Sequence, residues 1–498
     1  MFQKILIANR GEIAVRLSKT IQEMGIKAVS IYSSFDEFSQ HVAASNEAYH
    51  LSGQTLQETY LNIEEIIEIA KLAGADAIHP GYGFLSENVA FAQACKDAGI
   101  VFIGPEPKVI SGMGDKIVAK KIMQQAGVPV IPGWAGDIND LNEIKNVAEK
   151  IGYPVLVKAA AGGGGKGMRL VKDVSSLQEA LESAGREAQR AFSDGRVFIE
   201  KYIEDPRHIE FQIFGDSKGN IVHLFERECS IQRRHQKIIE ESPSVALSPE
   251  LRIKMGEAAI KAAKAIGYTN AGTVEFILDK NKNFYFLEVN TRLQVEHPVT
   301  ELVMHGDLVR AQLLIAAGES LQILQKDLKQ DGHSIECRIY AEDPENNFLP
   351  SIGKLHVYKE PQGPSIRVDS GVKEGDEVSI HYDPMLSKLI VWAKTRNAAI
   401  EKMLWALSNY IIIGVKTNVS FLHKVISTKA FKDGNIDTHF LEKHLVQEDL
   451  PSKESELQAL AISALIFNDQ KNISSKETSD SFSESQDPWL CAGEWRLV

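Results

Sequence analysis

Apolar and polar positions alternate along the first hundred residues with the periods of buried strands and amphipathic helices. The apolar run "KILIA" leads into a glycine-containing turn, Ile13, Leu17 and Ile21 then recur on one helix face, and "KAVSIY" is a second apolar run. The alternation continues through "NIEEIIEIAKLAGADAIHP" and "AFAQACKDAGIVFIGP". This series predicts a parallel-sheet domain over residues 1–115, with a long loop from His79 to Asn88 at the end of a strand, where open α/β sheets bind ligands.

Four consecutive glycines lie in "AAAGGGGKGMRL", residues 159–170, between the strand-like runs "PVLVKAA" and "GMRLV". The segment satisfies G-x-G-x-x-G, but a strand follows it instead of the helix that a dinucleotide site needs. The nucleoside-triphosphate loop also fails, because no Ser or Thr follows Lys166. We therefore interpret the segment as a glycine hairpin. Its backbone N–H groups, with Lys158 and Lys166 at its ends, suit a phosphate, although a surface hairpin without a ligand fits the loop equally well.

Pattern and composition divide the rest of the chain. The glycine hairpin lies in a small domain over residues 130–203, which we interpret as a lid. Residues 205–448 mix short strands and helices, which is typical of an α+β domain. The Ser-rich run "DQKNISSKETSDSFSESQD" predicts a polar linker over 449–487, and "PWLCAGEWRLV" predicts an apolar tail over 488–498 that docks on this chain or on a partner.

Composition excludes several classes of protein. The 498 residues are 44% hydrophobic and 24% charged, as in ordinary globular proteins, and are enough for three or four domains. The net charge of -12 argues against a nucleic-acid surface, so anionic substrates would need local clusters of basic residues. The four cysteines form no C-x-x-C pair, the N-terminus lacks a signal peptide, and no run approaches the ~20 apolar residues of a membrane span, so we expect a cytoplasmic protein.

The segment "EFILDKNKNFYFLEVNTRLQVEHPVTE" carries the clearest chemistry. Two strand-like runs flank the turn "DKNKN", so Glu275 and Glu288 should be neighbours on an antiparallel hairpin. Two carboxylates ~4 Å apart repel by roughly 1 to 4 kcal/mol at surface-like dielectric constants, so a cation must neutralise them. Oxygen ligands on adjacent strands, with nucleotide phosphates and water completing the shell, suit Mg²⁺.

Polar side chains continue at every second position after this hairpin, at Asn290, Arg292, Gln294 and Glu296. In an extended strand they would all share one face, with apolar residues on the other. A planar cation shaped for an oxyanion, followed by a carboxylate able to take a proton, makes sense as a reaction site. The alternative is a solvated edge strand with alternating charge.

Three further features are ambiguous by themselves. Arg233, Arg234, His235 and Lys237 in "QRRHQK" give a local positive field, but a charged helix end would look similar and is the interpretation that the cluster alone favours. His208 in "DPRHIE" is more typical of a structural histidine than of a ligand. Arg338, near apolar Ile335 and Ile339, fits a buried salt bridge but shows no role.

Together these motifs resemble the biotin carboxylase family of the ATP-grasp superfamily. The resemblance runs over residues 2–445, through "KILIANRGEIAVR", "HPGYGFLSEN", "KAAAGGGGKGM", "EKYIEDPRHIE", "QRRHQK", "EVNTRLQVEHPVTE", "ECRIYAEDP" and "YDPMLSKLI". It implies a combined α/β and α+β fold, the ATP-grasp fold with a Rossmann-like N-terminal parallel-sheet domain, a glycine-loop lid and a mixed C-terminal domain. The implied domains are 1–115, 116–204 with the lid 130–203, 205–330 and 331–448.

The resemblance also implies a role for individual residues. Lys116, Lys158, Gly164 and Gly165 would hold ATP phosphates, Glu200, Lys201 and Ile203 would line the adenine slot, and His208, Gln232 and His235 would lie near the nucleotide. Glu275, Glu288 and Asn290 match the positions for Mg²⁺ or Mn²⁺, through which both glutamates also contact ATP. Lys237, Arg292 and Val295 match the bicarbonate pocket, Glu296 the base and Arg338 the biotin-side cation, so Lys237, Arg292, Glu296 and Arg338 would be catalytic.

The family reaction phosphorylates bicarbonate with ATP and transfers the resulting CO₂ to biotin. No Met-Lys-Met biotinylation segment occurs here, the nearest string being "IKMGE", so we expect biotin on a separate carrier protein, a carboxyltransferase partner and a homodimer. An acyl-CoA, as in acetyl-CoA carboxylase and fatty acid synthesis, is the expected final acceptor. The alternatives are a 2-oxo acid such as pyruvate as the acceptor, or an ATP-grasp ligase with an amine acceptor.

A non-catalytic nucleotide sensor would be expected to lack Glu288, Arg292 or Glu296, and this chain has all three. The one local departure, Ser34-Phe35 in "YSSFDEFSQH", touches no expected catalytic position.

Overall fold

The structure is a computed structural model that describes residues 1–135, 141–160 and 168–445. Residues Met1–His444 form one compact unit, and the remaining unit, Leu445–Val498, lies outside the described residues apart from Leu445. The predicted linker 449–487 and tail 488–498 therefore lie outside the described residues. In the described ranges, no helix is both long and apolar enough to cross a membrane.

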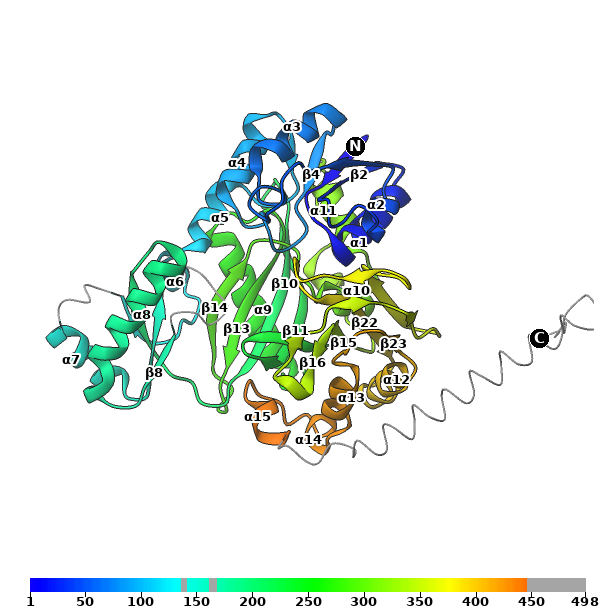
Figure 1. Cartoon of the computed structure of the whole chain (residues 1–498). Helices are drawn as coiled ribbons and strands as arrows, with labels where there is room; N and C mark the ends of the chain where they lie inside the picture. Colours follow the sequence, from blue (N-terminus) through cyan, green and yellow to red (C-terminus); the bar gives the residue numbers. More distant parts are fainter. Residues whose placement is uncertain (136–140, 161–167, 446–498) are drawn as a thin grey trace, which may run out of the picture. The chain divides into compact units, whose positions relative to one another are not determined.

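The N-terminal domain is a five-stranded parallel sheet, as the sequence predicts (Figure 1). Odd-numbered Ile5 and Ile7 pack with helix α1, whereas Leu6 packs with the helices of the opposite face, so both faces of the sheet are covered. The strands occur in the order β3 (Glu47–His50), β2 (Lys27–Tyr32), β1 (Lys4–Ile7), β4 (Ala77–His79) and β5 (Val101–Phe102), with helices α1 (Gly11–Glu23), α3 (Ile63–Ala73) and α4 (Val89–Asp97).

The predicted lid contains a four-stranded antiparallel sheet of its own. Helices α7 (Leu141–Ile151) and α8 (Leu177–Phe192) cover one face, which buries Val157, Leu181 and Ile199. Strands β7 and β8 pair as a hairpin around the glycine segment, which confirms its flanking strands, while residues 161–167 themselves lie outside the described residues. The strand order is β6 (Gly133–Trp134), β9 (Val197–Lys201), β7 (Val155–Ala159) and β8 (Arg169–Val171).

An eight-stranded antiparallel sheet carries seven of the expected site residues: His208, Gln232, Lys237, Glu275, Glu288, Asn290 and Arg338. Helix α9 packs on one face, where small residues such as Ala259 and Ala262 let it approach closely (Figure 1). A Cβ on Gly256 would meet the His223 ring at 2.3 Å, so only glycine fits this contact. The strand order is β14 (Phe284–Asn290), β13 (Asn270–Leu278), β10 (Arg207–Gly215), β11 (Ile221–Arg233), β12 (Gln236–Ser242), β15 (His333–Tyr340), β22 (Met385–Ala393) and β20 (Ile366–Ser370), and the main helices are α6 (Lys116–Gln125), α9 (Pro249–Ala265), α10 (His297–Met304), α11 (Leu308–Ala316), α12 (Arg396–Ser408), α13 (Val419–Ser427) and α15 (Phe440–His444).

Two local predictions about this sheet need correction. The strand expected through Asn290 to Glu296 ends at Asn290, because Pro298 in the first turn of α10 favours a helix start and residues 291–296 turn into it. The basic cluster is not a helix end. Arg234 and His235 form the turn between β11 and β12, both with positive φ.

Candidate active site

Lys237 on β12 is the centre of the site. Its Nζ contacts three carboxylates, Glu210 Oε2 at 2.5 Å, Glu275 Oε1 at 2.9 Å and Glu296 Oε1 at 2.6 Å. Burial disfavours the charge of this ammonium, but the three carboxylates outweigh burial and raise the pKa of Lys237 well above its usual value. Lys237 therefore stays charged, and the carboxylates still exceed it in charge.

Two buried arginines supply further positive charge. Arg227 on β11 contacts Glu210 through Nε at 2.5 Å, and Arg338 on β15 contacts Glu296 Oε2 through Nη2 at 2.9 Å. Burial opposes ionisation of Glu296, but Lys237 and Arg338 overcome it and hold the pKa of this carboxyl well below its usual range. Glu296 is consequently ionised at neutral pH and able to accept a proton.

Arg338 also contacts a second acid. Its Nε lies 2.6 Å from Glu240 Oε1, and burial raises the pKa of Glu240 to about 7 despite this contact. Arg338 is 7% exposed, which confirms the buried salt bridge that the sequence allowed. The guanidinium thus lies between two acids of different acidity.

Glu275, Glu288 and Asn290 lie together, as the hairpin predicted. Glu275 and Glu288 are direct cross-strand partners, and Asn290 Nδ2 donates to Glu275 Oε1 at 2.7 Å. Glu288 is the more accessible carboxylate, with Lys116 Nζ 3.5 Å from its Oε2. Two carboxylates and one amide oxygen, already in contact with the lysines Lys116 and Lys237, fit Mg²⁺. These residues therefore fit the metal.

Arg292 is held by one residue far away in the chain and by one close to it. Its Nε contacts Glu87 Oε2 at 2.9 Å in the loop after β4, and its Nη2 donates to Asn290 Oδ1 at 3.1 Å. Val295 presents its carbonyl to Lys388 Nζ at 3.0 Å. The residues expected to bind bicarbonate, Lys237, Arg292 and Val295, thus all belong to or contact residues 275–296, although residues 291–296 do not form a strand.

The residues expected to bind the nucleotide differ in their contacts and in their exposure. Lys158 contacts Glu200 Oε2 at 2.7 Å, and His208 contacts both Glu275 Oε2, at 2.9 Å, and Gln232 Nε2, at 3.0 Å. The Lys201 ammonium donates to the Gly152 carbonyl at 2.7 Å, so its side chain serves the lid itself. Ile203 is half-buried and His235 is exposed in its turn, whereas Gly164 and Gly165 lie outside the described residues.

Several residues of this network escaped the sequence reasoning. Arg227 is fully buried and donates to Gln212, Thr273, Gln294 and Thr300 besides Glu210. Glu87, Glu210 and Glu240 are missing from the prediction as well. The available signal was the run "FERECS" in an otherwise apolar strand, because a charged side chain pointing into a sheet core needs a partner.

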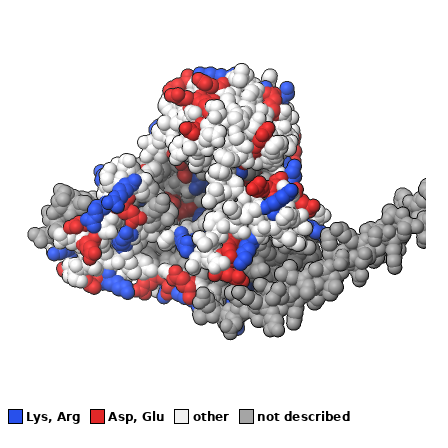
Figure 2. Space-filling model, viewed as in Figure 1, with Lys and Arg blue, Asp and Glu red and all other residues white. Residues whose placement is uncertain are grey.

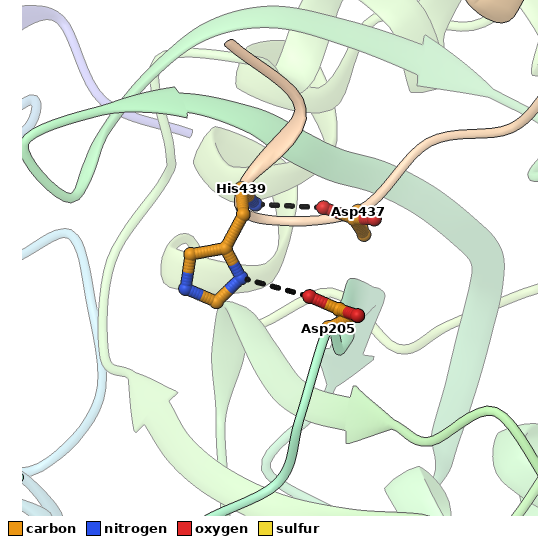
Figure 3. A group of neighbouring side chains, drawn as sticks. All are labelled: Asp205, Asp437 and His439. Carbon is orange, nitrogen blue, oxygen red and sulfur yellow. Dashed lines mark hydrogen bonds and ion pairs between the residues drawn. The ribbon is translucent and has the colours of Figure 1, made fainter. Parts of the chain in front are cut away.

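Two further groups have metal-compatible spacing, and one of them shares Glu275 with the residues that fit Mg²⁺. His208, Glu210 and Glu275 have a metal-compatible spacing, as do Glu210, Cys229 and Glu296, but Lys237 contacts the carboxylates of both groups. Asp205, Asp437 and His439 form a third group of this kind outside the site (Figure 3). Lys443 contacts both aspartates there, at 2.7 and 2.6 Å.

Comparisons with known proteins agree with this geometry. Family models match the chain as "Biotin carboxylase, N-terminal domain" over residues 1–110, "Carbamoyl-phosphate synthase L chain, ATP binding domain" over 115–324 and "Biotin carboxylase C-terminal domain" over 336–443. Biotin carboxylase 2 of Bacillus subtilis is 53% identical and covers 89% of this chain and 100% of its own. The mitochondrial methylcrotonoyl-CoA carboxylase subunit alpha of Rattus norvegicus is 50% identical over 96% of this chain and 68% of its own.

A solved structure has the same fold. The biotin carboxylase domain dimer of Hydrogenobacter thermophilus 2-oxoglutarate carboxylase, in complex with MgADP, ADP and bicarbonate, aligns with a TM-score of 0.87 and 49% identity, covering 90% of this chain and 100% of that one. The predicted ATP-grasp fold class and the family resemblance are confirmed. The chain belongs to the biotin carboxylase family, ligases that use ATP, Mg²⁺ and biotin on a carrier protein.

Proposed function

We propose that the residues around Lys237 carboxylate carrier-bound biotin with bicarbonate at the expense of ATP. The observation that carries this assignment is Glu296, an ionised carboxylate held between Lys237 at 2.6 Å and Arg338 at 2.9 Å. A base between two cations can take a proton from an anion that the same cations bind. That combination suits bicarbonate better than a neutral amine.

The residues have separate tasks in this scheme. Lys237, Arg292 and the backbone of Val295 bind bicarbonate, and Glu296 removes its proton. An oxygen of bicarbonate then attacks the γ-phosphorus of ATP, the bond to ADP breaks, and carboxyphosphate forms. Carboxyphosphate divides into CO₂ and a phosphate trianion, the phosphate takes the N1′ proton of biotin, and N1′ attacks the CO₂ beside Arg338.

A second set of residues would hold the nucleotide and the metal. Lys116, Lys158 and the glycine hairpin hold phosphates, Glu200, Lys201 and Ile203 line the adenine slot, and His208, Gln232 and His235 lie near the nucleotide. Glu275, Glu288 and Asn290 would hold Mg²⁺, which when bound offsets charge on the transferring phosphoryl group. Closure of the lid would keep water from the labile anhydride.

The final carboxyl acceptor and the partner proteins are inferred from the relatives of this chain. An acyl-CoA is the favoured final acceptor, supported by the methylcrotonoyl-CoA carboxylase relative, and a 2-oxo acid is the alternative, supported by the 2-oxoglutarate carboxylase structure. Acetyl-CoA and fatty acid synthesis stay a prediction. A separate biotin carrier, a carboxyltransferase and a homodimer complete the proposal, the last supported by the dimer of the solved relative.

A cytoplasmic location is also part of the proposal. Cys95, Cys229 and Cys337 are free and buried, as expected in a reducing compartment. On the face shown in Figure 2, acidic and basic side chains are interspersed, without an extended basic area for nucleic acid. Mitochondrial relatives make mitochondria the alternative.

Steady-state ATP hydrolysis tests the proposal. The purified full chain with Mg²⁺ and ATP should hydrolyse ATP only when bicarbonate is present, and free biotin should increase the rate. Hydrolysis that ignores bicarbonate and biotin but responds to ammonia or an amine would replace the assignment with the amine ligase.

A further inference from the structure

Lys120 on α6 reaches into the predicted lid from outside it. Its Nζ contacts the Glu200 carboxylate on β9 and lies 5.3 Å from the centre of the Phe198 ring. The same ammonium donates to the carbonyl of Ile131 at 3.4 Å. The Lys120 side chain is only 16% exposed and that of Glu200 only 2%. No role for Lys120 follows from the motifs or the site described above.

The lid sheet brings a second lysine to the same carboxylate. In the antiparallel register Leu156 pairs with Glu200 and Lys158 pairs with Phe198, so Lys158, Phe198 and Glu200 share one face. Lys158 Nζ lies 2.7 Å from Glu200 Oε2, while Lys120 takes Oε1. Two lysine side chains therefore share one buried carboxylate, where burial and the neighbouring Lys158 lower the pKa of Lys120 to about 7.

We propose that Lys120 is a positioning residue for ATP: it keeps Glu200 paired so that Lys158 is free to turn toward the phosphates. The inference rests on the phosphate-binding role proposed for Lys158. If Lys120 were absent, a phosphate could recruit Lys158 only by leaving a buried carboxylate without a partner, which is costly. With Lys120 in place, Glu200 keeps a lysine partner whether Lys158 contacts Glu200 or turns toward the phosphates.

Nucleotide binding to single variants tests this inference. Lys120→Met should weaken ATP and ADP binding roughly ten- to hundredfold, the value of one hydrogen bond to a charged group, but leave adenosine binding within about twofold. Adenosine carries no phosphate and makes no demand on Lys158. Lys121→Met is the matched control, because Lys121 is the next lysine of the same helix and is exposed, and it should bind both ligands as the parent does.

A double variant separates positioning from a merely structural role. Replacing Glu200 by Gln in the Lys120→Met protein removes the carboxylate that needs a partner, so the ratio of ATP affinity to adenosine affinity should recover toward the parent ratio. Glu200→Gln alone controls for the adenine contacts expected of Glu200. Unfolding midpoints measured without nucleotide show whether each variant is folded. Equal loss of ATP and adenosine affinity, or no recovery in the double variant, would overturn the proposal. Binding is measured without bicarbonate or biotin, so this result is independent of whether the biotin assignment holds.

Discussion

Two lysine-centred acidic clusters in this chain have similar distances and different surroundings. Lys237 contacts Glu210, Glu275 and Glu296 at 2.5 to 2.9 Å, and Lys443 contacts Asp205 and Asp437 at 2.6 to 2.7 Å. The Lys237 side chain is 13% exposed and its carboxylates at most 5%, whereas those of the second cluster are 20 to 37% exposed. Burial, and not ion-pair geometry, therefore separates the reaction site from the surface network.

The largest difference is expected on removing each central cation. Lys237→Met leaves three buried carboxylates without their shared partner and should destabilise the fold by about 3–5 kcal/mol, besides abolishing turnover. Lys443→Met, the matched change at the surface, should cost at most about 1 kcal/mol. Urea unfolding of the two variants measures both values. Equal losses would show that burial is not the deciding factor.

The second prediction concerns the proposed base, Glu296, which glutamine can replace with almost no change in shape. Glu296→Gln should reduce kcat by about 10²- to 10⁴-fold, because the amide cannot accept the bicarbonate proton. Bicarbonate-dependent ATP hydrolysis measures the loss. Asp205→Asn makes the same acid-to-amide change in the surface cluster and should keep kcat within about twofold. A Glu296→Gln variant with parental kcat would rule out the base assignment.

Metal dependence sharpens the comparison within the site. Glu288→Gln removes the accessible carboxylate beside Lys116, so the Mg²⁺ concentration for half-maximal turnover should rise by about tenfold or more. A magnesium titration at saturating ATP and bicarbonate measures the shift. Unchanged magnesium dependence would mean that Glu288 is not a ligand.

The smallest effect concerns pH. Burial, with Lys116 nearby, lowers the pKa of Lys158 to about 8. A bound triphosphate favours the ammonium form and raises that pKa, so ATP affinity should be full below this value and fall as the pH rises above about 8, by less than tenfold per pH unit. Titrations of ATP between pH 6.5 and pH 9.5, with adenosine as control, test this. ATP affinity that is flat across the range would contradict it.

The sequence could predict features that depend on local pattern. The β13–β14 hairpin was predictable because alternation and the "DKNKN" turn fix the register in which Glu275 faces Glu288. The strand beyond Asn290 was wrong although its polar residues do converge, since Gln294 Nε2 donates to Glu275 Oε1 at 2.8 Å from a turn and not from a strand. Polar residues at every second position are compatible with either a strand or an irregular turn, so this spacing alone cannot distinguish the two structures.

Long-range partners were out of reach of local pattern. Glu210, Arg227 and Glu240 lie on separate strands, and only the strand order β10-β11-β12-β15 makes them neighbours of Lys237 and Arg338. The contact of Lys120 was equally unpredictable. A lysine on an amphipathic helix is normally expected to be exposed to solvent, and only the fold places Glu200 of strand β9 beside it. The site roles and the domain boundaries inferred from the family stay predictions.

The central claim is that bicarbonate is phosphorylated at the cluster around Lys237. The most direct measurement uses bicarbonate labelled with oxygen-18 and mass analysis of the phosphate released from ATP by the full chain with Mg²⁺ and biotin. The account predicts one labelled oxygen in each phosphate, because the attacking oxygen of bicarbonate stays on phosphorus when carboxyphosphate breaks down. Phosphate that carries oxygen only from ATP and water would contradict the claim.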